Sequence, residues 1–163
     1  MNFKFYLKKL HASEEFKEFK KENASAFLCS AFFSIDKTGE DNKQHLDFFN
    51  EGKIFSFQLE ENCKIVLLEN FGDKTPSEIF ADYDFKFKKI EKLIQKRIDD
   101  EEIKNTLQKL LISIQNSKGK ISLTGTAFIS GMGIINFIID LNNMEITYFE
   151  KKSIFDMMKI FKK

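Results

Sequence analysis

The stretch K-Q-H-L-D-F-F, residues 43–49, carries a histidine and an aspartate two positions apart. In a β-strand alternate side chains share one face, so His45 and Asp47 would point the same way. A histidine beside a carboxylate can transfer protons near neutral pH, which is what general acid–base catalysis requires. The first hypothesis is therefore an acid–base pair formed by His45 and Asp47. The alternative is the water-facing side of an ordinary sheet.

Neighbouring stretches extend this polar set. If Leu46 and Phe48 face the core, the outward positions of three adjacent strands are Ser30, Ser34, His45, Asp47, Ser56 and Gln58. Serine, histidine and aspartate are the types that nucleophilic catalysis uses. However, the chain has no G-x-S-x-G elbow, and same-face residues two apart on a strand are separated by about 7 Å. We therefore predict a binding surface at Ser34, His45, Asp47, Ser56 and Gln58, with His45 and Asp47 as the only catalytic candidates.

Motifs for metals, phosphates and redox chemistry are missing from the sequence. The two cysteines, Cys29 and Cys63, form no C-x-x-C motif, and Cys29 lies among apolar residues as a small core residue would. The acidic loop D-K-T-G-E-D-N at 36–42 has its glycine at the fourth position and no acid at the twelfth, unlike a calcium loop. The S-G-M-G at 130–133 lacks the helix that follows a phosphate-binding loop. We predict no metal and no cofactor.

Composition narrows the class of protein. The 163 residues are 42% hydrophobic and 31% charged, with a net charge of +1, as in an ordinary globular domain. The 20 phenylalanines, with no tryptophan, indicate an A/T-biased genome rather than an aromatic ligand surface. Arg97 is the one arginine, which disfavours specific readout of nucleic-acid bases. The sequence shows no secretory signal and no 18-residue apolar run, so we predict a cytoplasmic protein without a membrane span.

Hydrophobic periodicity predicts the elements. A helix begins at Ser13 as N-cap, with Glu14 and Glu15 in its first turn, and a helical turn or two precede it. Alternation then predicts strands at 26–35, 43–49, 53–60 and 63–69. Apolar stripes predict a helix over 87–98 and a second helix that begins at a capping box formed by Asp99 and Glu102. The second helix ends in the stretch 116–120, with Gly119 as its C-cap. Three strands at 121–129, 134–141 and 145–150 follow, and an amphipathic helix over 153–163, capped by Ser153, closes the chain.

The grouping of strands with strands predicts an α+β fold, with an antiparallel sheet or sheets and helices packed on one face. The length fits a single domain over 1–163. The two strand blocks resemble each other, as in A-F-F-S and A-F-I-S, which leaves open two helix-plus-meander repeats over 13–70 and 85–150.

Three segments carry a resemblance. A-F-L-C-S-A-F-F-S-I-D, F-S-F-Q-L-E and S-I-F-D-M-M-K resemble small α+β proteins of uncharacterised families in archaea. I-I-N-F-I-I-D-L-N-N-M-E-I-T is similar to the last hairpin of PepSY-type domains, with Asn143 or Met144 in place of the usual turn glycine. The resemblance implies a fold in which an antiparallel meander follows a helix, and it carries no catalytic residues across.

These observations favour a non-enzymatic binding or interaction module for a protein or a small molecule, one that also self-associates as a homo-oligomer. One alternative is a small enzyme that uses His45 and Asp47 as acid–base groups. Another is peripheral membrane binding through the helix at 153–163, which is disfavoured because so short a helix more often docks on its own sheet.

Overall fold

The computed structural model describes residues 2–68, 74–80, 84–117 and 119–153. Across these ranges the chain forms three α-helices, eight strands and one short 3₁₀ helix. The first half contains α1 (Phe3–Ala12), α2 (Glu14–Glu22), β1 (Phe27–Asp36), β2 (Lys43–Asn50), β3 (Lys53–Gln58), η1 (Leu59–Glu61) and β4 (Lys64–Leu68). The second half contains α3 (Phe87–Asp100), β5 (Leu107–Ser117), β6 (Lys120–Ile129), β7 (Gly133–Asp140) and β8 (Glu145–Ser153). The predicted α+β class is confirmed.

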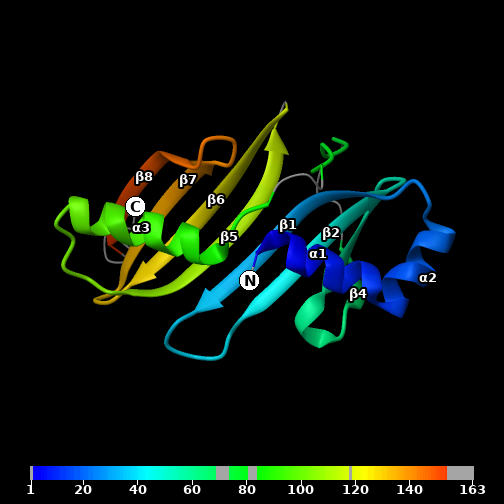
Figure 1. Cartoon of the computed structure of the whole chain (residues 1–163), viewed down its shortest axis with the longest axis horizontal. Helices are drawn as coiled ribbons and strands as arrows, with labels where there is room; N and C mark the ends of the chain where they lie inside the picture. The colour runs from blue at the N-terminus through cyan, green and yellow to red at the C-terminus, as the bar shows by residue number, and fades with distance from the viewer. Residues whose placement is uncertain (1, 69–73, 81–83, 118, 154–163) are drawn as a thin grey trace, which may run out of the picture.

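All eight strands belong to one antiparallel sheet with the order β4-β3-β2-β1-β5-β6-β7-β8. Each half is a meander of neighbouring hairpins, and β1 pairs with β5 to join the halves (Figure 1). The two strand blocks of the sequence therefore share one sheet. From α2 to β4 and from α3 to β8 the order is a helix followed by four strands, with η1 added in the first half, as two helix-plus-meander repeats would produce. A common origin of the halves stays a prediction.

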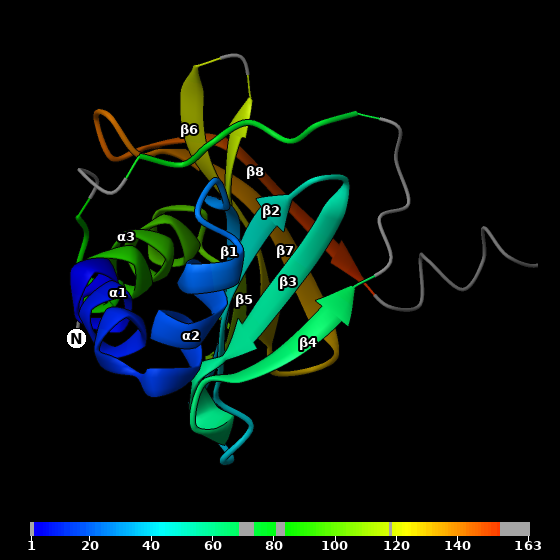
Figure 2. The ribbon, with the colours of Figure 1, turned by 90° about the vertical axis from the view of Figure 1, so that its right-hand side faces the viewer.

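The helices lie on one face of the curved sheet, as Figure 2 shows. Their boundaries follow local capping chemistry. The Asn2 side chain accepts a hydrogen bond from Phe5 N at 3.0 Å at the start of α1. At the start of α2 the predicted N-cap is confirmed, because Ser13 Oγ accepts from Phe16 N at 3.2 Å.

The core lies between the helices and the sheet, and its two halves differ in composition. Under α2 the rings of Phe16 and Phe19 pack on Phe48, Phe55 and Phe57 with centroid separations of 5.0–6.3 Å. Under α3 the core is mainly aliphatic, and the predicted stripe of Phe87, Ile90, Ile94 and Ile98 is buried. The phenylalanines thus fill core volume, as the composition argument proposed.

The predicted second helix, from the Asp99 capping box to the stretch 116–120, is wrong, because residues 107–117 form strand β5. The spacing of Leu107, Leu110 and Ile114 fits a helical stripe, but the run L-L-I-S-I is apolar at neighbouring positions and fits a strand equally well. Pairing with β1 on one side and β6 on the other decides the outcome. The helix or strand propensity of a segment predicts its structure poorly when neighbouring strands pair with it on both sides.

The capping residues proposed for that helix have other roles. Asp99 lies in the last turn of α3, and Glu102 follows the helix in a left-handed conformation with φ of +54°. Gly119 also has positive φ, +81°, in the connection between β5 and β6 rather than at a helix end.

At the carboxyl end β8 continues to Ser153, so this residue ends a strand where a helix cap had been predicted. The rest of the predicted terminal helix, 154–163, lies outside the described residues. Within the described ranges, none of the helices has the length and apolar character needed to cross a membrane.

Candidate functional site

The polar residues predicted as a site do lie on neighbouring strands and on one sheet face. His45 is paired in register with Gln58, and Asp47 with Ser56. Asp47 is also opposite Ser30 on β1. Strand alternation therefore predicted the shared face correctly, but Ser34 and Ser56 are each only 3% exposed. These two serines offer almost no surface to a ligand on that face.

His45 and Asp47 do not bond to each other. His45 Nε2 lies 2.8 Å from Glu60 Oε1, and the Gln44 backbone N–H donates to Glu60 Oε2 at 2.9 Å. Burial opposes ionisation of the Glu60 carboxyl, but these bonds outweigh it and hold the pKa of Glu60 below its ordinary value. Glu60 belongs to η1, and nothing in the K-Q-H-L-D-F-F pattern pointed to it.

Asp47 has partners of its own. Ser30 Oγ donates a hydrogen bond to Asp47 Oδ2, while Cys29 Sγ donates to the Asp47 backbone oxygen at 3.3 Å. Asp47 Oδ1 is buried without a hydrogen-bond partner among the described residues. Burial, and then the negative charge of Asp47, raise the pKa of the Cys29 thiol to about 12. Cys29 is thus a thiol at neutral pH, and a serine–aspartate bond without a base cannot generate a nucleophile.

Within the described ranges, no three His, Cys, Asp or Glu side chains gather closely enough to hold a metal ion. The two cysteines are both free and buried there.

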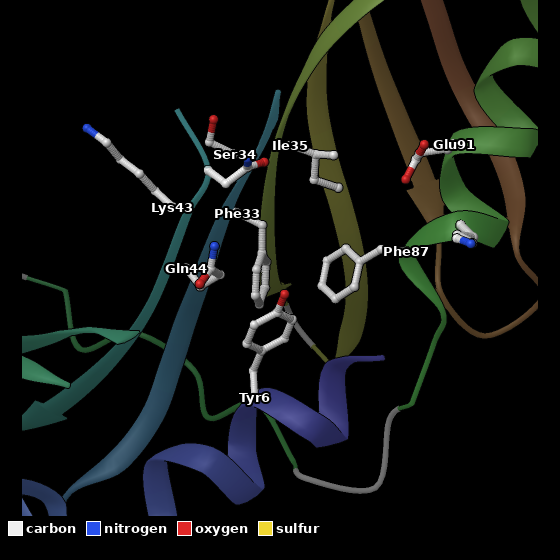
Figure 3. Close-up of a pocket in the computed structure, with 10 residues that line it drawn as sticks. Tyr6, Phe33, Ser34, Ile35, Lys43, Gln44, Phe87 and Glu91 are labelled. Carbon is white, nitrogen blue, oxygen red and sulfur yellow. The ribbon is translucent and has the colours of Figure 1, made fainter. Parts of the chain in front are cut away.

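The structure brings together a different set of residues, in a pocket on the helix side of the sheet (Figure 3). The pocket has a volume of about 410 Å³ and lies where α1 and α3 approach the first two strands. Its wall is aromatic: Phe33 and Phe87 have ring centroids 4.6 Å apart, and Tyr6 lies 5.3 Å from Phe33 and 5.6 Å from Phe87. Each ring comes from a separate element, α1, β1 or α3.

The local folding of each element explains why these rings meet. Tyr6 lies on α1 between the buried positions Phe3 and Leu7, and its ring is partly buried. Phe87 is the first residue of α3, directly after the bridge that Lys86 makes with Asn2 at the start of α1. That bridge joins the beginnings of the two helices. Burial raises the pKa of Tyr6, so its phenol stays neutral over the physiological range.

Polar and charged groups surround the aromatic wall. They are Ser34, Asn42, Lys43, Gln44, Lys88 and Glu91. Ser34 Oγ donates to the Asp41 backbone oxygen at 2.7 Å, so its hydroxyl is already engaged. The Gln44 side chain reaches toward the wall beside Phe33, whereas Lys43 projects away from it (Figure 3).

The balance of charge around the pocket is positive. Glu91 is paired with Lys37 at 3.3 Å, so its charge is largely matched. Lys43 has Asp41 as a neighbour at 3.7 Å, while Lys88 is exposed and has no ion-pair partner within the described part of the chain. A ligand with a negative group near the Lys88 side of the pocket would therefore meet a favourable field.

Of the five binding residues predicted from sequence, only Ser34 lines this pocket. Phe33, Phe87 and Gln44 were missed because their side chains lie on faces assigned to the core. Tyr6 was missed because no face was predicted for the helical turns before Ser13. In a sequence, a tyrosine within an apolar stripe is interpreted as a core residue. The structure is needed to show that a pocket lies beside it.

No family model matches the chain, and no curated protein or solved structure is significantly similar to it.

Proposed function

We propose that this protein is a non-enzymatic binding module, and that its pocket takes a small ligand with an apolar, aromatic body and an acidic group. The observation that carries the proposal is the aromatic wall of Tyr6, Phe33 and Phe87 in a pocket of about 410 Å³. Ligand sites are typically concave, mostly apolar and provided with a few polar groups that fix orientation. The pocket has this composition, since Gln44 and Lys88 supply polar groups beside the rings.

The lining favours binding over catalysis. Among the described residues that line the pocket there is no cysteine, histidine or aspartate, and their one carboxylate, Glu91, is held in an ion pair with Lys37. The Ser34 hydroxyl bonds to a backbone carbonyl rather than to a base, so it is not an activated nucleophile. The acid–base pair at His45 and Asp47 loses its main support as an alternative, because Glu60 is the partner of His45.

A matched pair of probes tests the proposal. 2-Naphthoate and 2-naphthylmethylammonium have the same aromatic body and opposite charges, and backbone amide NMR shifts report where each one binds. We expect naphthoate to shift the amides around Phe33, Gln44 and Phe87, with a dissociation constant of about 0.1–1 mM for a ligand of this size. The ammonium compound should bind more weakly.

Two variants locate the binding. Gln44→Trp fills the pocket without removing core packing and should abolish naphthoate binding. Lys88→Glu should weaken the binding of naphthoate by about 3- to 10-fold and strengthen the binding of the ammonium probe, since it reverses one charge at the rim of the pocket. Lys92→Glu makes the same charge change one turn along α3, outside the pocket lining, and serves as the control. Equal affinity for both probes, or shifts remote from the three rings, would contradict the proposal.

A further inference from the structure

The open edge of the first half of the sheet, strand β4, differs from the other edge. β4 has the sequence K-I-V-L-L, and among the described strands it pairs with β3 alone. Three of its side chains are large, apolar and exposed: Ile65 at 38%, Leu67 at 59% and Leu68 at 40%. Within the described part of the chain, no backbone hydrogen bond outside the β3 ladder engages residues 64–68.

Strand β8 at the opposite edge shows how an edge is normally protected. Its sequence E-I-T-Y-F-E-K-K-S places four charged residues on nine positions, and Lys152 and Glu150 form an ion pair at 3.0 Å. Charged edge strands discourage pairing with another chain, whereas an exposed apolar edge invites it. The contrast between the charged edge strand β8 and the apolar edge strand β4 favours β4 as the edge that pairs with a partner strand.

Helix α2 leaves the β4 end of the core uncovered. Its Phe19 ring packs on Phe55 and Phe57 of β3, with centroids 5.0 and 5.2 Å away. The next row outward, Ile65 and Leu67, is paired in register with those two phenylalanines. Between α2 and this row lies a shallow cleft of about 360 Å³.

The α2 side of that cleft is acidic. Glu15, Glu18 and Glu22 line it together with Phe19, Phe55 and Ile65. All three carboxylates are exposed, and within the described residues none of them forms an ion pair. The cleft therefore combines an apolar floor, an unpaired strand edge and a row of unmatched negative charge.

We infer that β4 is a docking edge for an extended, basic peptide segment of a partner protein, which adds to the sheet as a further antiparallel or parallel strand. Strand addition of this kind takes its affinity from main-chain hydrogen bonds and its specificity from alternate side chains. On the helix side of the new strand, a lysine or arginine can lay its stem along Ile65 and Leu67 and reach a glutamate of α2 with its charged end. On the other face, an apolar residue would continue the row of Val66 and Leu68.

A second copy of this chain is a poorer occupant. Antiparallel pairing of two β4 strands keeps the same face of both sheets on one side, because the two-fold axis is perpendicular to the sheet. Two α2 helices would then flank the joint, each with its three glutamates, and like charges across an interface disfavour association. Charge complementarity thus selects a basic strand, and this inference is independent of the ligand proposed for the pocket.

The test uses the full chain and a fluorescein-labelled peptide, V-K-V-K-V-K-V, read by fluorescence polarisation at low salt. Its partner probe is V-E-V-E-V-E-V. We expect the lysine peptide to bind at least 10-fold more tightly than the glutamate peptide. The triple variant Glu15→Gln, Glu18→Gln, Glu22→Gln should lower the affinity for the lysine peptide by about 3- to 30-fold. Salt at 0.5 M should remove most of this difference between the wild type and the variant.

The control variant removes the same charge elsewhere. Glu40→Gln, Glu51→Gln, Glu102→Gln changes three exposed residues away from the cleft and should alter affinity by less than about 2-fold. Equal weakening by both triple variants would overturn the inference, because binding would then follow net charge and not the cleft.

Two N-methylated peptides test the strand geometry. Only alternate residues of an added strand donate N–H groups to β4, so N-methylation of the valines and N-methylation of the lysines should have different effects. One isomer should lose binding and the other should keep it. If both isomers bind like the parent peptide, no strand is added and the inference fails.

Analytical ultracentrifugation tests whether a second copy of this chain occupies β4, because it measures the oligomeric state. The wild-type chain and Leu67→Lys should sediment alike at micromolar concentration, because the homo-oligomer expected from the sequence would use a surface other than β4. A wild-type dimer that dissociates in Leu67→Lys would assign the edge to a second copy and overturn the inference. Naphthoate binding at the pocket is measured in a separate experiment. Failure of the pocket proposal can therefore be distinguished from failure of the β4 inference.

Discussion

His45 Nε2 lies 2.8 Å from the carboxylate of Glu60, a residue of the 3₁₀ helix η1, and not against Asp47 on its own strand. The same carboxylate accepts a hydrogen bond from the Gln44 backbone at 2.9 Å. Both side chains are mostly buried, with 21% of His45 and 23% of Glu60 exposed. Glu60 therefore attaches η1 to the start of β2, which makes the pair a structural contact between two parts of the meander that β3 separates in the chain.

Removal of this carboxylate should cost stability in a pH-dependent way. The folded pKa of Glu60 is lowered, so its ionised form stabilises the fold above the unfolded pKa, and that contribution is lost as pH falls through the folded value. We expect Glu60→Gln to lower the free energy of unfolding by about 0.5–1.5 kcal/mol at pH 6 and by less at pH 3. Urea denaturation at the two pH values measures the difference.

The neighbouring Glu61 provides the control, because its one ion pair within the described residues is an exposed contact with Lys64 at 3.1 Å. Glu61→Gln should change the stability by no more than about 0.5 kcal/mol. A Glu60→Gln effect that is the same at pH 3 and pH 6 would show that the charge of the group contributes nothing.

The Cys29 thiol should resist alkylation in the folded protein. Its pKa is raised to about 12 by burial and by Asp47, so at pH 8 about one molecule in 10⁴ carries a thiolate. We expect iodoacetamide to modify Cys29 at least about 10³-fold more slowly in the native protein than in guanidinium chloride. Peptide mass spectrometry separates Cys29 from Cys63, and rapid native labelling of Cys29 would contradict the burial described above.

Gly125 is required by the ring of Phe137. A Cβ atom at Gly125 would lie 2.2 Å from Cζ of Phe137, its paired residue on β7. Phe137 is fully buried, so it has no free space to move into. Gly125→Ala should lower the free energy of unfolding by about 1–3 kcal/mol through overpacking.

A double variant separates overpacking from a backbone effect. Phe137→Leu shortens the side chain that meets the new methyl group, so the cost of Gly125→Ala should fall when Phe137→Leu is present. Thermal or urea unfolding of the four proteins gives this coupling energy. Strict additivity would mean that the ring is not the cause.

Much of the fold could be predicted from local patterns. Alternation of apolar residues located strands β1–β4 and β6–β8, and the serine before E-E-F-K-E-F-K located the start of α2. These signals are strong because each strand is bounded by turn residues and α2 by a capping side chain, so the chemistry lies within a few positions. Strand β5 was missed because apolar residues at neighbouring positions, L-L-I, carry no clear period.

Some features of the candidate site could likewise be predicted from local sequence, and others depend on tertiary packing. That His45 and Asp47 share a sheet face could be predicted from local pattern, because the strand period is a local property of the backbone. The contact of Glu60 with His45, and the meeting of Tyr6, Phe33 and Phe87 in one pocket, depend on the packing of the whole fold. Those residues are distant in sequence, and their approach depends on how two helices pack on a single eight-stranded sheet. The availability of β4 is likewise tertiary, since an apolar strand becomes an open edge only when the strand order leaves it without a second neighbour.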